Sequence, residues 1–219
     1  MYQLAPMFAV PFAFDRHPDP TALNAELRAL FLAREAAGSR YQNPDPGTRR
    51  NGQVFESHFD LFNWPEPCVQ RLREFCLAAV VRTVGTLNGY DATALRRLEV
   101  NTDAWFHITR HLGFFALHNH PNATWSAVYC VSPGQRDASQ PDSGALSFMN
   151  PHSTKMMYLD PGVARMLEPP FGWTNFNFQL EPGQLVIFPS WVMHQVMPFY
   201  GTGERITVAL NCAFRLRDA

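Results

Sequence analysis

The sequence changes character near Gly89, and this change limits the fold more than any other feature. Before it, residues 21–37 and 65–88 carry apolar side chains at helical spacing, and Gly38 and Gly89 are suited to end the two helices. After it come short segments rich in β-branched and aromatic residues, typical of strands: 98–108, 113–118, 125–131, 144–149, 176–180, 184–188 and 205–214. Helices followed by many strands predict a mainly β jelly roll with N-terminal helices packed on its outside.

The length and composition fit one domain. The chain has 219 residues, 46% of them hydrophobic and 17% charged, which is enough apolar material for a substantial core. We therefore expect a single domain, 1–219, with a helical N-terminal part (1–95) and a jelly-roll core (96–219).

Charge and cysteine usage exclude several functions. The formal net charge is −1 and the charges are interleaved, so the sequence has neither the basic stripe of a nucleic-acid-binding protein nor a polybasic membrane-binding arm. No apolar run has the length of a transmembrane helix, and no secretory signal is evident. The four cysteines lack C-x-x-C spacing, which indicates free thiols in a reducing, cytoplasmic setting. We expect a cytoplasmic protein that acts on small molecules or peptides, and base rates favour a homodimer.

Two histidines separated by one residue, His118 and His120, lie at the end of a predicted strand. Alternate side chains of a strand project to the same side, so both imidazoles can reach one point. His194 follows another predicted strand, and a third imidazole would complete a metal site. Arg205 lies further along the chain, where its guanidinium could hold an anion beside the metal. These four residues predict a metal centre with a neighbouring anion site.

His120 has two interpretations. It is either a third ligand, which makes a three-histidine centre, or it hydrogen-bonds a bound molecule while a carboxylate such as Asp142 completes the site. A histidine on a strand is more often structural than a ligand, so the pair alone is a weak signal, and its agreement with His194 strengthens it. His107 and His111 flank a predicted turn and are interpreted as solvated.

Longer segments are similar to a known family: Ser57-His58-Phe59-Asp60-Leu61, His118-Asn119-His120-Pro121, Ser126-Ala127-Val128-Tyr129, and most specifically Gly183 to Val196. With these segments the chain resembles, over nearly its whole length, the 2-oxoglutarate and iron(II)-dependent oxygenases of the small bacterial type with an H-x-H-P motif. Jelly-roll oxygenases usually have H-x-D/E at this place, so His120 stands where a carboxylate is usual.

The resemblance implies a double-stranded β-helix that binds iron(II) and uses 2-oxoglutarate and dioxygen. The expected metal ligands are then His118, His120 and His194. Arg205 would pair with the distal carboxylate of 2-oxoglutarate in a bidentate geometry that lysine cannot match. Hydroxyl donors to the co-substrate are expected from Thr207, Ser126 and Tyr129.

The expected reaction is hydroxylation of an unactivated C–H bond in a small molecule or a peptide side chain, with release of succinate and CO2. Two alternatives stay open. One is a three-histidine dioxygenase that does not use 2-oxoglutarate, in which Arg205 binds the substrate's own carboxylate. The other is a non-catalytic jelly roll that binds a metal or an anion. The loop at 39–54 and the segment at 133–142 are the expected specificity elements.

Overall fold

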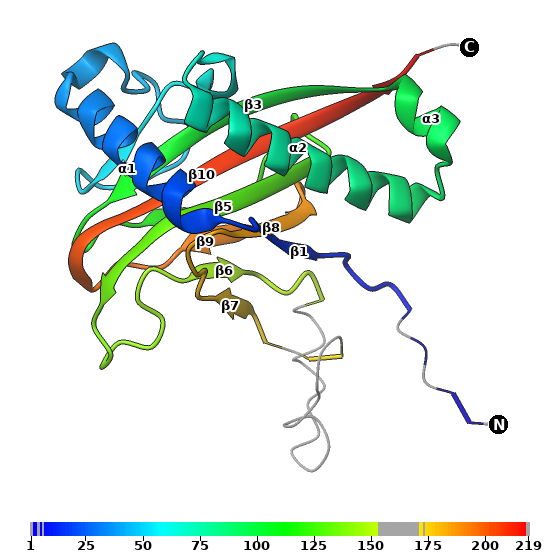
Figure 1. Ribbon diagram of the computed structural model, residues 1–219. Helices are drawn as coiled ribbons and strands as arrows, with labels where there is room; N and C mark the ends of the chain where they lie inside the picture. Colours follow the sequence, from blue (N-terminus) through cyan, green and yellow to red (C-terminus); the bar gives the residue numbers. More distant parts are fainter. Residues whose placement is uncertain (1, 4, 6, 153–170, 173, 218–219) are drawn as a thin grey trace.

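Two antiparallel β-sheets face each other in the computed structural model, which describes all residues except 1, 4, 6, 153–170, 173 and 218–219 (Figure 1). Within the described residues, the larger sheet has the strand order β1-β8-β5-β10-β3-β2 and the smaller sheet the order β4-β9-β6-β7. The strands of the larger sheet are β1 (Ala13–Arg16), β2 (Val54–Glu56), β3 (Leu98–Thr109), β5 (Trp125–Arg136), β8 (Gln184–Pro189) and β10 (Gly201–Leu216). Those of the smaller sheet are β4 (Phe115–His118), β6 (Leu146–Phe148), β7 (Phe176–Phe178) and β9 (His194–Val196). The fold is the expected mainly β jelly roll, a double-stranded β-helix.

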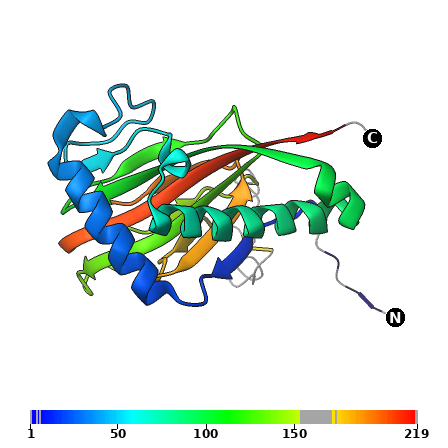
Figure 2. The ribbon, with the colours of Figure 1, turned by 45° about the horizontal axis from the view of Figure 1, so that its top comes forward.

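Two long helices, α1 (Pro20–Ala36) and α2 (Pro67–Asn88), cover the outer face of the larger sheet (Figures 1 and 2). Each has a proline in its first turn, where the missing N–H has no helical partner to lose. α2 ends at Gly89, whose φ of 64° is the left-handed conformation that glycine adopts at low cost. Short helices η1 (Gly38–Arg40), η2 (Leu61–Asn63) and α3 (Ala92–Arg97) complete the N-terminal part. None of the helices within the described residues is both long enough and apolar enough to span a bilayer.

The main core lies between these helices and the larger sheet. Phe31 of α1 stacks on Phe106 of β3, with ring centroids 4.1 Å apart. Ile108, Val208 and Leu210 face the same layer and are buried. Because side chains alternate along a strand, the other residues of β3, β5 and β10 project into the space between the two sheets. The larger sheet therefore packs against the helices with one face and lines an internal cavity with the other.

The N-terminal part contains short strands as well as helices. β1 pairs with β8 and β2 pairs with β3, so residues before position 96 supply both edges of the larger sheet. β2 and β9 are absent from the sequence-based assignment, because each has three residues and is too short to show an alternating pattern. The two long helices agree closely with prediction; α1 begins at Pro20 and α2 at Pro67.

Candidate metal centre

A cavity of about 530 Å³ lies between the two sheets. Its walls are formed by β3, β5 and β10 on one side and by β4 and β9 on the other, with Gly47 and Thr48 of the long loop at its rim. This volume is typical of small-molecule sites. The cavity contains every histidine predicted as a ligand, together with Arg205.

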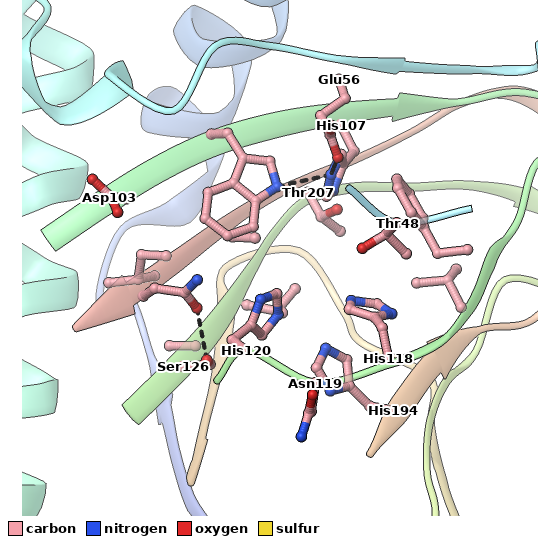
Figure 3. Close-up of a pocket in the computed structure, with 18 of the residues that line it drawn as sticks. Thr48, Glu56, Asp103, His107, His118, Asn119, His120, Ser126, His194 and Thr207 are labelled. Atoms are coloured by element: carbon pink, nitrogen blue, oxygen red, sulfur yellow. Dashed lines mark hydrogen bonds and ion pairs between the residues drawn. The ribbon is translucent and has the colours of Figure 1, made fainter. Parts of the chain in front are cut away.

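Three imidazoles meet on the wall formed by the smaller sheet (Figure 3). His118 ends β4, His194 begins β9, and the two residues are paired across the strands. His120 lies two residues after His118, and its backbone N–H donates a hydrogen bond to the carbonyl of Ser190. One nitrogen from each of the three rings lies within 4.8 Å of the other two. The predicted convergence of these side chains is therefore present.

Backbone carbonyls orient two of the three rings. Nδ1 of His118 lies 2.7 Å from the carbonyl oxygen of Ala116, and Nδ1 of His194 lies 2.9 Å from that of Val192. A carbonyl can only accept, so each Nδ1 carries the proton and each Nε2 keeps a free lone pair. Such contacts are the usual means of orienting a metal-binding histidine. The side chain of His120 makes no hydrogen bond to the described residues, so its ring is less constrained.

Burial keeps all three imidazoles neutral. It lowers the pKa of His194 to about 3 and that of His120 to about 4, and it also lowers the pKa of His118. Mutual repulsion between the rings, if charged, acts in the same direction for His120 and His194. Neutral imidazoles at neutral pH have lone pairs for a cation, and three of them suit iron(II) and other late divalent transition metals.

No carboxylate belongs to this cluster among the described residues. Asp142 is exposed, and its carboxylate accepts a hydrogen bond of 2.9 Å from Nδ2 of Asn177 on β7. It does not line the cavity, so the structure contradicts its candidacy as a ligand. The donor set that fits a metal here is three nitrogens, and a cation would keep its full charge until an anionic ligand binds.

Arg205 of β10 lies on the opposite wall and is 5% exposed. Its Nε donates a 2.9 Å hydrogen bond to the carbonyl of Gly144, while its two terminal nitrogens make no hydrogen bond and no ion pair with the described residues. Burial lowers the pKa of this guanidinium. A buried cation without a carboxylate partner that borders a cavity is suited to bind an anion from solution.

The three predicted hydroxyl donors have different positions. Thr207 is buried, follows Arg205 on the same face of β10, and lines the cavity. Ser126 also lines the cavity, but it pairs with Asn211, six residues beyond Arg205 on β10, and its hydroxyl hydrogen-bonds Asn211 and Ser190. It lies too far along the strand to share an anion with Arg205.

Tyr129 does not face the cavity. Its hydroxyl donates a 2.8 Å hydrogen bond to Oδ1 of Asn24 in α1, and its ring is part of the core beneath the helices. The prediction that Tyr129 binds the co-substrate is therefore wrong. The physical reason is strand alternation, which sends its side chain to the face opposite Ser126.

A buried polar network on the cavity wall was missed by the sequence analysis. Nε2 of His107 lies 3.0 Å from Oε2 of Glu56 and 2.9 Å from Nε1 of Trp105 (Figure 3). Burial favours protonation of Glu56, but bonds from His107 and Asn43 and the charge of Arg50 lower its pKa overall. Burial lowers the pKa of His107. The expectation of a solvated His107 is wrong. His107, Trp105 and Asp103 occupy alternate positions of β3, and this spacing already indicates that all three side chains project to the same side of the sheet.

In this jelly roll, neutral imidazoles converge on one wall and a buried guanidinium lies on the other. Such an arrangement is typical of enzymes that bind a metal ion and an anionic ligand side by side. Residues 103–211 match the family model described as "Putative 2OG-Fe(II) oxygenase". The matched stretch runs from β3 to β10 and includes His118, His120, His194 and Arg205. The chain belongs to this family, and it is an oxidoreductase dependent on Fe(II) and 2-oxoglutarate.

Solved structures share the fold. A prolyl-4-hydroxylase of Pseudomonas putida is 21% identical, with 95% of this chain and 94% of that chain covered and a TM-score of 0.54. A Trichoplax adhaerens prolyl hydroxylase in complex with a peptide fragment of hypoxia inducible factor is 13% identical, with coverages of 92% and 82% and a TM-score of 0.54. HygX of Streptomyces hygroscopicus, with nickel, 2-oxoglutarate and hygromycin B bound, is 12% identical, with coverages of 94% and 83% and a TM-score of 0.55. No curated protein matches the sequence.

Proposed function

We propose that this chain hydroxylates an unactivated C–H bond of a small molecule or peptide, with iron(II) held by His118, His120 and His194. The observation that supports this most strongly is the convergence of three neutral imidazoles within 4.8 Å, opposite a buried guanidinium without a carboxylate partner. Bound iron(II) and 2-oxoglutarate supply the chemistry: one atom of dioxygen enters the substrate and the other enters succinate, with loss of CO2.

The histidines contribute unequally to holding the metal. His118 and His194 are the more preorganised pair, because the carbonyls of Ala116 and Val192 fix their rings with Nε2 free. His120 replaces the usual carboxylate. Its neutral ring leaves the metal with one more positive charge than a carboxylate would, which strengthens the attraction for an anionic co-substrate.

Arg205 and Thr207 would hold the distal carboxylate of 2-oxoglutarate. Both side chains are buried on the same inward face of β10, two residues apart, and line the cavity across from the histidines. The two terminal guanidinium nitrogens can form parallel hydrogen bonds with a carboxylate, and the Thr207 hydroxyl can donate another. The enclosing sheets exclude water from this contact, which strengthens it.

The rest of the cavity is available to the substrate. Phe59, Asp103, Asn119 and Asn122 line it, and so does the loop residue Thr48. Similar folds bind a peptide in one solved structure and hygromycin B in another. Those ligands support substrates of either kind for this chain.

The proposal is tested by anaerobic metal binding followed by oxygen addition. We expect the purified protein to bind one Fe(II) per chain and to form succinate only when Fe(II), 2-oxoglutarate and dioxygen are all present. His194→Ala should abolish Fe(II) binding and succinate formation, while Arg215→Ala, a substitution of an exposed residue, should leave both unchanged. Oxygen uptake without succinate would instead favour a dioxygenase that does not use 2-oxoglutarate, and absence of metal binding would refute the proposed centre.

A further inference from the structure

The cavity has a second charged end, opposite Arg205. β3 and β10 are antiparallel, with Arg205 paired to Thr109 and Asn211 paired to Asp103. Six positions of β10 separate the two pairs, which is about 20 Å of strand. Asp103 lines the cavity at this far end, as Figure 3 shows, with its carboxylate away from Thr48 and His107. Arg205 and Asp103 thus place opposite charges at the two ends of one cavity.

The charge of Asp103 is not matched by a neighbour. Its side chain is exposed and makes no hydrogen bond or ion pair within the part of the chain that the structure describes. Arg205 is the one basic side chain among the described lining residues apart from the neutral histidines. The other acidic lining residue, Glu56, is engaged by His107 and Arg50. An exposed carboxylate alone would mean little, but this one borders an aromatic surface.

The aromatic surface consists of Phe59 and Trp105. Their rings stack with centroids 4.3 Å apart and an interplanar angle of 30°. Trp105 is buried beneath, whereas Phe59 is 44% exposed and lines the cavity. Trp105 also lies edge-on to His120, with ring centroids 5.9 Å apart. Aromatic faces attract organic cations, and a nearby carboxylate adds to that attraction.

We propose that the substrate carries an organic cation, an ammonium or guanidinium group, held by Asp103 and the Phe59–Trp105 pair at the outer end of the cavity. This inference rests on the proposed function, since it names the substrate class of the same site. Asp103 and Trp105 are two residues apart, about 7 Å along the strand, and Trp105 faces His120. The carbon that is oxidised would therefore lie a few bonds from the cationic group.

Three probes of similar size but different charge test the proposal: choline, its neutral isostere 3,3-dimethylbutan-1-ol, and the anion 3,3-dimethylbutanoate. Binding is followed by NMR through the indole N–H signal of Trp105, in metal-free protein and in zinc-loaded protein, both saturated with 2-oxoglutarate so that Arg205 is occupied and cannot bind the acid. We expect choline to bind about fivefold more tightly than the alcohol, because an exposed ion pair and a cation–π contact each contribute modestly. The acid should bind most weakly.

Substitutions assign the preference to Asp103. Asp103→Asn should remove most of the advantage of choline, and Asp103→Lys should reverse it in favour of the acid. Glu74→Gln, an exposed change on α2, is the matched control and should leave the order unchanged. Equal binding of choline and the alcohol, tighter binding of the acid, or an unaltered preference in Asp103→Asn would overturn the inference.

These probes need neither iron nor turnover, so the two proposals can fail separately. Loss of the charge preference with intact succinate formation would refute the cation subsite alone. An intact preference in a protein that binds no iron would refute the metal centre alone.

Discussion

Replacing Arg205 gives the most quantitative test of the anion site. Arg205→Met removes the guanidinium but keeps much of the side-chain volume. In the structure its two terminal nitrogens have no partner among the described residues, so both are available to a carboxylate. A hydrogen bond to a charged group contributes about 1.5 kcal/mol at the lower end of the usual range, so two contribute about 3 kcal/mol. The Kd of 2-oxoglutarate should therefore rise about 150-fold.

The same substitution should not destabilise the protein without ligand. Arg205 is a buried charge without a carboxylate partner, and burial lowers its pKa, so the folded state carries the penalty of keeping it charged. The substitution also removes the hydrogen bond from Nε of Arg205 to the carbonyl of Gly144, and this loss cancels part of the stability gained by removing the buried charge. We expect the Tm of Arg205→Met without 2-oxoglutarate to match or exceed that of the unchanged protein, which separates a binding role from a structural one.

The assay is anaerobic calorimetry of 2-oxoglutarate binding to nickel-loaded protein, with Tm measured in parallel. Arg215→Ala on the exposed end of the same strand is the control and should bind 2-oxoglutarate normally. Arg205→Lys keeps the charge but not the bidentate geometry and should weaken binding about tenfold. Unchanged affinity in Arg205→Met, or a loss of affinity that only parallels a large fall in Tm, would refute the assigned role.

Three further predictions concern the histidines and the core. His194→Ala should weaken Ni(II) binding by more than about 100-fold in calorimetry, and His120→Ala by at least about tenfold if it is a ligand; unaltered binding in His120→Ala would remove it from the metal. The free energy of unfolding of the metal-free protein, measured by denaturant titration, should fall as the pH falls from about 6.5 towards 4. In this range the histidines of the unfolded chain are protonated, whereas His120 and His194 of the folded protein, with pKa values of about 4 and about 3, stay neutral. A free energy of unfolding that does not change with pH would contradict this prediction. Tyr129→Phe leaves Oδ1 of Asn24 without its donor and should cost about 1–2 kcal/mol of unfolding free energy, with 2-oxoglutarate affinity unchanged; weakened affinity at normal stability would restore Tyr129 to the co-substrate site.

The metal cluster was predictable because its geometry is mostly local. His118 and His120 are two residues apart at the end of a strand, where both side chains can reach one point, and their partner His194 stands in the most family-specific stretch of the chain. The same rule exposes an error: Ser126 and Tyr129 are three residues apart on one strand and cannot both face the same side. Strict alternation along the strand therefore excludes one of the two from the cavity, and the excluded residue is Tyr129.

Other parts of the site depend on contacts that no local pattern records. Glu56 and His107 are separated by 51 positions and meet because the short strand β2 joins the edge of β3. A three-residue strand after a long polar loop has too little sequence to show its pairing. Arg50, interpreted as part of a solvated pair, is nearly buried beside Glu56 for the same reason. Long-range pairing of short segments is what sequence patterns fail to capture here.

The placement of β1 and β2 at opposite edges of the larger sheet has a consequence for how the chain can be divided. A strand edge presents unpaired N–H and C=O groups that invite pairing with other molecules and hence aggregation. β1 covers β8 from Gln184 to Ile187, and β2 covers β3 from His107 to Thr109. Both covering strands are short, so each offers little new edge for further pairing. A fragment limited to residues 96–219 would keep every predicted metal ligand yet expose two sheet edges and the apolar face under α1 and α2, so the N-terminal part protects the jelly roll from aggregation through these surfaces.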